Sequence, residues 1–245
     1  MADQSVMKGG IIAAGAGSRL RQAGWTVPKP LVEVAGLPLI GRVIRNFRAA
    51  GITSLVIIFN EDERDCERWV RSQYPDLVLQ IFVKTTASSL ESFREVCARL
   101  GSGPALISTV DAWCPEDEFV AFVTAVRQYP PDVTVLGVTP LVADERPLWV
   151  VLNPAGRITR IGGDSGEMVT AGLYAVPERV RRLSSMNGQG RLREFLSRLV
   201  AQGEPVYGVV IPHVVDVDRA EDVALAEAMV KKEAGEAAKP QGAAK

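Results

Sequence analysis

Strand-like and helix-like segments alternate along the first half of the chain, and this alternation is the feature that most limits its fold. The strand-like runs lie at 7–13, 55–59, 77–83 and 105–109, and helical patterns separate them at 40–50, 62–73 and 88–100. Residues 55–59 are continuously apolar, which is typical of a parallel strand covered on both faces. Repeated strand–helix–strand units predict a mostly parallel sheet with helices on both sides.

The pattern changes after residue 130, where strand-like segments follow one another without long helices between them. This change predicts an antiparallel or mixed extension of the same sheet. The expected strands are 132–139, 148–152, 157–161, 169–175, 205–210 and 213–217, and the expected helices are 177–184, 191–202 and 219–233. We expect one domain over residues 1–233. The tail 234–245, rich in Ala, Gly and Lys, is expected to be disordered.

Composition excludes several classes of function. The net charge is −1 over 245 residues, so no general basic field favours binding to nucleic acid. The three cysteines have no CxxC spacing, which argues against a disulfide framework and a zinc site. No apolar run reaches the about 18 residues that a membrane-spanning helix needs. We therefore expect a cytoplasmic protein without membrane or nucleic-acid partners.

A glycine-rich turn follows the first strand, with Gly15 and Gly17 separated by one residue. Glycines let the backbone approach a ligand closely, and their N–H groups can line an anion site. A dinucleotide-binding motif would need a third glycine, where this chain has Leu20. Pro28 and Pro30 also interrupt the helix that such a site requires. A Walker A loop is excluded because no GxxxxGK[ST] occurs.

Two cations accompany this turn. Arg19 follows Gly17 by two residues, and Lys29 stands between two prolines that restrict its backbone. A guanidinium, a fixed ammonium and free N–H groups together suit a triphosphate. The loop is therefore predicted to bind a nucleotide through its phosphates.

The motif Gly15-Ala-Gly-Ser-Arg19-Leu, followed by Pro28-Lys29-Pro30-Leu31, resembles the signature of the sugar-phosphate nucleotidyltransferase superfamily. The resemblance implies a three-layer α/β/α, Rossmann-like fold with a mostly parallel mixed sheet. It also implies an enzyme that transfers NMP from an NTP to a small phosphorylated acceptor and releases pyrophosphate.

Acidic residues near two predicted strand ends are candidate metal ligands. Asp111 closes the strand that begins at residue 105, at the sheet edge where open α/β folds bind ligands. Asp216 and Asp218 alternate along the chain and would face the same side. Asp218 could instead cap the last helix, with Glu221 completing a capping box. By resemblance, Asp111 and Asp218 match the family's two metal-binding positions, and the expected cofactor is Mg²⁺.

The resemblance also implies roles for the other residues of the site. Arg19 and Lys29 are expected to be catalytic, acting on the phosphates. Ser88 either contacts the nucleotide or only caps the next helix. His213, the one histidine, is expected to be structural. The expected nucleotide-binding residues are Ala13, Ala14, Gly15, Gly17, Ser18 and Ser88, and the expected acceptor-binding residue is Gly172.

The acceptor is less well defined. Many sugar-nucleotide members of the family have a Glu-Lys pair before the strand that contains Gly172, and residues 161–165 here lack the lysine. The ending V-D-V-D-x-x-E-D resembles inositol-phosphate and phosphocholine cytidylyltransferases. CTP or another pyrimidine NTP, with a sugar-, polyol- or alcohol-phosphate, is therefore favoured. The alternatives are a molybdenum-cofactor guanylyltransferase-like enzyme, a non-catalytic nucleotide-binding module and, most distantly, a Rossmann oxidoreductase. The sequence leaves open the oligomeric state and whether Trp113 lines the acceptor pocket.

Overall fold

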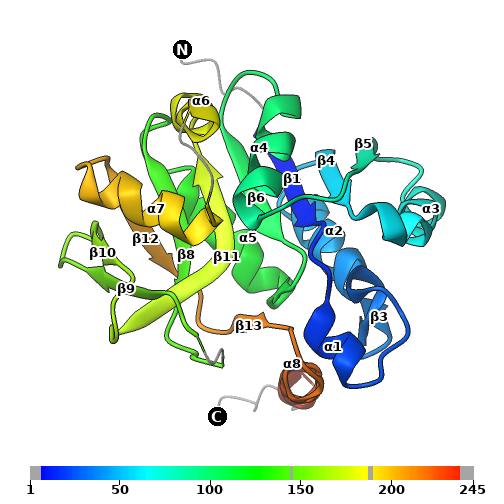
Figure 1. Ribbon diagram of the computed structural model, residues 1–245. Helices are drawn as coiled ribbons and strands as arrows, with labels where there is room; N and C mark the ends of the chain where they lie inside the picture. Colours follow the sequence, from blue (N-terminus) through cyan, green and yellow to red (C-terminus); the bar gives the residue numbers. More distant parts are fainter. Residues whose placement is uncertain (1–6, 144–145, 187–189, 238–245) are drawn as a thin grey trace, which may run out of the picture.

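A computed structural model describes residues 7–143, 146–186 and 190–237. The chain forms a mixed nine-stranded sheet with helices on both faces (Figure 1). The expectation of a three-layer α/β/α arrangement is thus confirmed. Among the described residues, no helix is long and apolar enough to cross a membrane.

Four parallel strands form the half of the sheet that the N-terminal part of the chain supplies. They are β6 (Ala105–Thr109), β1 (Lys8–Ala13), β4 (Ser54–Phe59) and β5 (Val78–Val83), in that spatial order. The register pairs are continuous along β1 on both sides, so β1 lies at the centre of this half. All four strands end at the same edge of the sheet, as the sequence patterns predict.

The other half of the sheet is the expected mixed extension. The long strand β11 (Met168–Val176) pairs antiparallel with β6, and also with β8 (Thr134–Thr139) and β9 (Trp149–Leu152). Strand β10 (Ile158–Ile161) continues from β9, and β12 (Val206–Val210) runs parallel to β8. Between Thr170 and Tyr174 the register of β11 against β8 shifts, which marks an irregularity in the middle of the strand.

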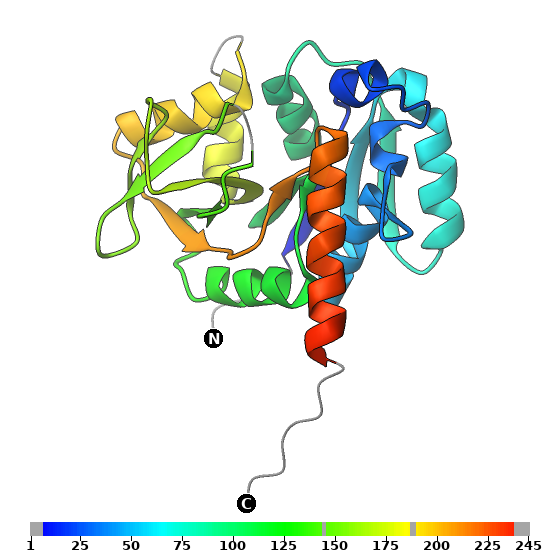
Figure 2. The same cartoon turned by 90° about the horizontal axis from the view of Figure 1, so that it is seen from below.

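The helices divide between two hydrophobic clusters, one on each face of the sheet. On the first face, α4 contacts both α6 and α7. On the second face, α2 packs against α5, and Figure 2 shows α8 as one long helix along that side. The first face has α4 (Ser89–Arg99), α6 (Glu178–Met186) and α7 (Leu192–Ala201), and the second has α2 (Leu39–Ala49), α3 (Arg64–Gln73), α5 (Glu116–Val126) and α8 (Ala220–Ala237).

Two glycines in β1 allow this close packing on both faces. A Cβ atom on Gly9 would collide with the side chains of Leu55 and Phe47, and one on Gly10 would meet Val96 at 2.6 Å. Glycine weakens an isolated strand, but here it lets helices on both faces approach the backbone. The two residues therefore serve the core on both faces of β1.

Several elements differ from the sequence-based expectations, among them the short strands β2 (Glu33–Val34) and β3 (Leu37–Pro38), which no pattern predicts. Helix α5 lies where the patterns predict no element, because apolar residues such as the exposed Ala121 widen its apolar side and weaken the amphipathic pattern. A short helix, α1 (Ser18–Gln22), follows the glycine turn directly, before the prolines. Helix α8 continues to Ala237, four residues into the expected tail, and 238–245 lie outside the described residues.

A further difference concerns the predicted strand 213–217. Only Val215–Asp216 forms a strand, β13, and it pairs antiparallel with β7 (Ala112–Trp113) instead of joining the main sheet. The small β7–β13 sheet has a direct consequence for the site, because it joins the two acidic segments of the chain.

Candidate active site

The glycine-rich turn and the lysine between prolines are built as one unit. Gly17 has a φ of +58°, and a Cβ atom there would lie 2.9 Å from the Cβ of Lys29. Lys29 begins a short 3-10 helix (Lys29–Leu31), which the flanking prolines favour by fixing φ. Only glycine combines this backbone conformation with so close an approach. The two halves of the motif therefore occur together because they touch.

A second contact folds the turn on itself. Arg21 donates from Nε to the Ala16 carbonyl oxygen at 2.8 Å, and its Nη2 donates to the same oxygen. A Cβ atom on Gly15 would meet no other atom within 4 Å, so the turn faces open space there. The backbone of the turn is thus fixed at one end and accessible at the other.

The acidic residues come together through the β7–β13 pairing. Val215 lies opposite Trp113, and the Val217 N–H donates to the Asp111 carbonyl oxygen at 3.0 Å. These bonds hold the segment that contains Asp216 and Asp218 beside the end of β6, although about a hundred residues of chain separate them.

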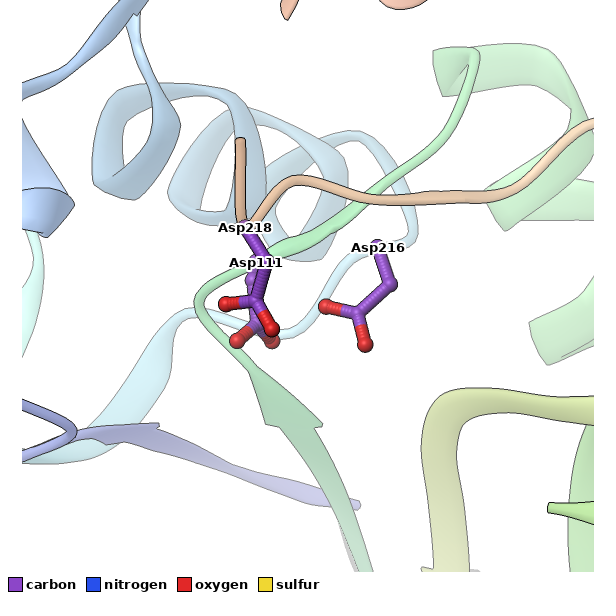
Figure 3. A group of neighbouring side chains, drawn as sticks. All are labelled: Asp111, Asp216 and Asp218. Carbon is purple, nitrogen blue, oxygen red and sulfur yellow. The ribbon is translucent and has the colours of Figure 1, made fainter. Parts of the chain in front are cut away.

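Three carboxylates then meet at one point. Asp111, Asp216 and Asp218 each offer an oxygen within 4.8 Å of the others, and Figure 3 shows the side chains gathered at the strand ends. Clustered carboxylate oxygens are ligands that hard divalent cations such as Mg²⁺ and Ca²⁺ accept. The expected pair Asp111 and Asp218 is brought together, and Asp216 is a third candidate ligand that the family resemblance did not single out. The D-x-D spacing was the signal for it.

The capping alternative for Asp218 is wrong. Its side chain does not cap α8, because both oxygens contact cations of the signature loop. The capping group is Asp222, which accepts from the N–H groups of Asp218 and Arg219 at 3.0 and 2.8 Å. Glu221, the residue expected to complete a capping box, makes neither bond.

Lys29 lies between the carboxylates. Its Nζ donates to Asp111 Oδ2 at 2.6 Å and also to Asp218 Oδ1, while only 6% of its side chain is exposed. Arg19 Nη1 donates to the other oxygen of Asp218 at 2.5 Å from a more exposed position, 41%. The two expected catalytic cations are therefore joined to the two expected metal ligands.

Neighbouring charges shift the pKa values of Lys29 and Asp111. Burial lowers the pKa of Lys29, but the charges of Asp111, Asp218 and Asp216 raise it by more, so Lys29 stays protonated. Burial raises the pKa of Asp111, and Lys29 more than reverses this effect, leaving it below its ordinary value. A buried ion pair of this kind costs desolvation energy that neighbouring charges must offset. The site is therefore charged on both sides at neutral pH.

A cavity of about 350 Å³ opens beside the carboxylates. Gly172, the expected acceptor-binding residue, lines it, with a φ of +70° and no room for a Cβ against Thr109 and Ala112. Arg193, on the first turn of α7, is the one basic residue among the described residues that line it. The sequence patterns gave no signal for Arg193. The main polar and charged lining residues are Ser89, Thr109, Asp111, Thr139, Thr170, Tyr174, Arg193, Asp216 and Asp218.

Trp113 and His213 take structural positions. Trp113 is 1% exposed and does not line the cavity, and the Arg42 guanidinium lies 5.7 Å from its ring centroid. His213 contacts Glu118 on α5, through its ring Nδ1 at 2.6 Å and its backbone N–H at 2.9 Å. His213 therefore fastens the segment before β13 to α5.

A second polar group contacts Ala14, the residue just before the glycine turn. The buried Asn60 donates to the Ala14 carbonyl oxygen at 3.4 Å and accepts from Thr85 Oγ1 at 3.3 Å. Ser88 Oγ accepts from the Glu91 N–H at 3.2 Å, so Ser88 is the N-cap of α4. The capping alternative for Ser88 is thus confirmed. Its contact with a nucleotide stays a prediction.

Comparisons with known proteins identify a matching family and a shared fold. The family described as the MobA-like NTP transferase domain matches residues 9–204, which include Arg19, Lys29 and Asp111 but end before Asp216. A mannose-1-phosphate guanyltransferase of Gibberella zeae is 33% identical over 125 residues, or 47% of this chain and 34% of the relative. The bifunctional protein GlmU of Bartonella quintana is 29% identical over 191 residues, or 78% of this chain and 33% of the relative.

The chain thus spans about a third of the length of these curated relatives. Among solved structures, the inositol-1-phosphate CTP transferase from T. maritima superposes with a TM-score of 0.80 over 95% of this chain and 99% of that one. Their sequences are 21% identical, so this likeness shows the fold alone.

Proposed function

The chain belongs to the MobA-like NTP transferase domain family, and from that premise we propose that it is a nucleotidyltransferase. It transfers NMP from an NTP to a small phosphorylated acceptor and releases pyrophosphate. The observation that carries the proposal is the position of Lys29, buried between Asp111 and Asp218 at the edge of the glycine turn. A non-catalytic module would not need to keep these three groups in contact.

The reaction is an in-line displacement at the α-phosphorus. An oxygen of the acceptor phosphate forms a new bond to this phosphorus, and the bond to the β-phosphate oxygen breaks as pyrophosphate leaves. Arg19 and the backbone of residues 15–18 bind the β- and γ-phosphates. Lys29 stabilises the negative charge that builds up on the α-phosphate. The acceptor phosphate is already ionised, so the protein has no proton to remove from it.

We propose that Asp111 and Asp218, with Asp216 beside them, hold Mg²⁺. The ion would neutralise charge on the α-phosphate and the acceptor phosphate. The carboxylates keep their oxygens at one point, and the short β7–β13 sheet fixes their separation. Positioning and charge neutralisation are the whole of the protein's contribution.

The cavity beside Gly172 is proposed to receive the acceptor. It contains one guanidinium, several hydroxyl groups and aliphatic walls, and the three aspartates proposed to hold Mg²⁺ lie at one side of it, which suits a phosphorylated polyol, sugar or small alcohol. Arg193 supplies a positive charge for the acceptor's anionic group. The side chain is half-buried, and its Nη1 donates to the Arg146 carbonyl oxygen at 3.5 Å.

A pyrimidine NTP, with CTP first, is the favoured donor because of the C-terminal V-D-V-D-x-x-E-D sequence. A guanylyltransferase acting on the molybdenum cofactor is the second candidate, and the family match favours it. The two candidates share the phosphate site and differ in the nucleobase, so nucleotide preference separates them.

Pyrophosphate release tests the proposal. The protein is incubated with Mg²⁺, with each of ATP, GTP, CTP, UTP and dTTP, and with sugar-1-phosphates, inositol phosphate and phosphocholine. Release that requires one NTP together with one acceptor establishes the activity and identifies both substrates. If GTP binds more tightly than the other NTPs and no acceptor on this panel gives pyrophosphate release, the molybdenum-cofactor candidate is favoured. Absence of NTP binding by calorimetry contradicts the nucleotidyltransferase function.

A further inference from the structure

The segment 84–88, which joins β5 to α4, lies beside the glycine-rich turn. Thr85 Oγ1 donates to Asn60 Oδ1 at 3.3 Å, and Asn60 in turn donates to the Ala14 carbonyl oxygen at 3.4 Å. Thr85 also contacts Glu61 at 3.4 Å. One side of the segment is thus connected to the turn that is proposed to bind the phosphates.

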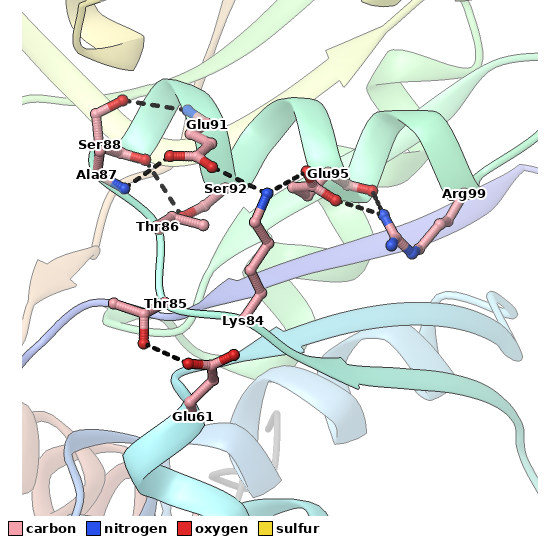
Figure 4. Close-up of polar contacts among 10 residues, drawn as sticks. All are labelled: Glu61, Lys84, Thr85, Thr86, Ala87, Ser88, Glu91, Ser92, Glu95 and Arg99. Carbon is pink, nitrogen blue, oxygen red and sulfur yellow. Dashed lines mark hydrogen bonds and ion pairs between the residues drawn. The ribbon is translucent and has the colours of Figure 1, made fainter.

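Glu91 holds the same segment from the other side, on the first turn of α4 (Figure 4). Its Oε2 accepts from the Ala87 N–H at 2.7 Å, and its Oε1 pairs with Lys84 Nζ at 3.0 Å. Its own N–H donates to Ser88 Oγ at 3.2 Å. The Ala87 N–H and then Lys84 lower the pKa of Glu91, so it is ionised at neutral pH. One residue therefore fixes both ends of the segment.

Other residues of α4 add to this arrangement without duplicating it. Ser92 Oγ lies 2.6 Å from Thr86 Oγ1 and 3.4 Å from the Ser88 carbonyl oxygen. Glu95 pairs with Lys84 Nζ at 2.7 Å and with Arg99, and makes no bond to the backbone of the segment. Glu91 and Glu95 share Lys84 as a partner, so they form a natural pair for comparison.

The segment still has backbone groups to offer a ligand. Among the described residues, no acceptor bonds to the N–H of Thr86 or of Ser88. The edge of a nucleobase presents donors and acceptors in a fixed pattern, which a backbone can recognise only when its own groups are fixed.

We propose that Glu91 is a positioning residue that holds the segment 84–88 in the shape that receives the nucleobase of the NTP. The inference rests on the proposed function, because it assumes that the phosphates bind at the adjacent turn. Glu91 touches neither Lys29 nor the three aspartates. Its contribution is therefore to nucleotide affinity and base discrimination, and the chemical step is independent of it.

The physical reason is preorganisation. A segment ordered before binding does not pay the entropy of ordering when the ligand arrives. Removing the carboxylate frees the Ala87 N–H and releases Lys84, so the segment must be ordered by the nucleotide instead. Binding weakens by about tenfold for the loss of one charge-assisted bond of this kind. Discrimination between nucleobases falls as well, because misplaced backbone groups fit all bases equally poorly.

The test compares Glu91→Ala, Glu91→Gln and Glu95→Ala with the wild type. The Kd for each NTP is measured by calorimetry without acceptor, and KM and kcat follow with the best acceptor. In Glu91→Ala, Kd and KM for the preferred NTP rise about tenfold, kcat and the acceptor KM change less than about twofold, and the preference between NTPs narrows. Glu91→Gln recovers most of the affinity, because its amide oxygen can still accept from Ala87. Glu95→Ala stays near wild type.

Two results would overturn the inference while leaving the proposed function intact. The first is that the wild-type protein is active and the Kd of Glu91→Ala for the preferred NTP is unchanged. The second is an equal loss of NTP affinity in Glu91→Ala and Glu95→Ala, which would indicate a general effect on α4. Wild-type protein that binds no NTP overturns the proposed function itself, and the inference with it.

Discussion

The site has a phosphate side, the glycine turn proposed to bind the NTP, and an acceptor side, the cavity beside Gly172. The two sides differ in how their charges are arranged. On the phosphate side, Lys29 and Arg19 are already paired with Asp111 and Asp218. On the acceptor side, the cavity is lined mainly by hydroxyl and aliphatic groups, and Arg193 is its one basic residue among those described. The first side is a tightly coupled set of charges, whereas the second is a shaped space with one basic residue, and the aspartates lie where the two sides meet.

This difference teaches why one side is recognisable in the sequence. Direct contact between Gly17, Lys29 and Asp111 fixes residue types and spacing, so the contact leaves a motif. A cavity wall needs only suitable size and polarity at each position, and many residues satisfy that. The reaction class is therefore encoded in a motif, and the acceptor is encoded in a shape.

The largest effect should follow from removing a charge on the phosphate side. We expect Asp111→Asn to lower kcat by about a hundredfold or more, because it removes a proposed metal ligand and a partner of Lys29. The matched control is Asp117→Asn on the exposed side of α5, which should keep wild-type turnover. Steady-state pyrophosphate release measures both. Equal activity in the two variants would remove Asp111 from the mechanism.

A buried carboxyl group near the phosphate side should make stability depend on pH. Burial raises the pKa of Glu63 from 4.5 to about 7, against the opposing charge of Arg21, and its Oε2 has no partner among the described residues. The unfolded chain loses this proton near pH 4.5, but the folded chain keeps it to about pH 7. The stabilising contribution is complete below pH 4.5 and is lost as pH rises to about 7.

Glu63→Gln should remove this dependence. The difference between 4.5 and about 7 corresponds to about 3 kcal/mol at most. We expect the variant to match the wild type at pH 5 and to exceed its free energy of unfolding at pH 8, measured by urea denaturation. Glu33→Gln, at an exposed position, should change neither value. A variant less stable than wild type at pH 8 would mean that the ionised Glu63 carboxylate stabilises the folded protein, so that burial does not raise its pKa.

Much of the fold follows from the sequence. The strands β1, β4, β5 and β6 are predicted from strand-like runs that alternate with helical patterns, and the continuous apolar run of β4 indicates a strand covered on both faces. Helix α5 is missed because it is apolar on most sides and lacks a clear stripe. Strand β13 is misplaced in the sheet, because its partner β7 is only two residues long and has no pattern of its own. A cytoplasmic location stays a prediction.

The site, like the fold, could be predicted from the sequence only in part. The motif residues Arg19 and Lys29 and the ligand candidates Asp111 and Asp218 converge as the resemblance implies. Asp216 joins them only through the β7–β13 pairing, which no local pattern indicates. Arg193 reaches the cavity because α7 packs against α4. Such a meeting of distant segments depends on tertiary packing, so periodicity cannot reveal it.

Arg193 offers a smaller test, on the acceptor side. We expect Arg193→Met to raise the acceptor KM about tenfold and to leave the NTP Kd unchanged, because it removes one charge-assisted contact to an anion. The control is Arg198→Met, farther along the same helix and absent from the residues that line the cavity. A change in NTP affinity instead would break the division of the site into two sides.

The smallest expected effect is a gain in metal affinity and not a loss. It depends directly on the ion pairs that Lys29 makes with Asp111 and Asp218. Without nucleotide, Lys29 Nζ occupies oxygens of Asp111 and Asp218 that a cation would need. Lys29→Met should therefore raise the affinity for Mn²⁺ alone about fivefold, because the carboxylates lose a competing positive charge. Mn²⁺ binding is followed by electron paramagnetic resonance, with Lys231→Met, at an exposed lysine in the C-terminal half of α8, as the control. With NTP present the same substitution should weaken binding, since Lys29 then faces the α-phosphate. A loss of Mn²⁺ affinity in the absence of nucleotide would mean that Lys29 arranges the carboxylates for the ion and does not compete with it.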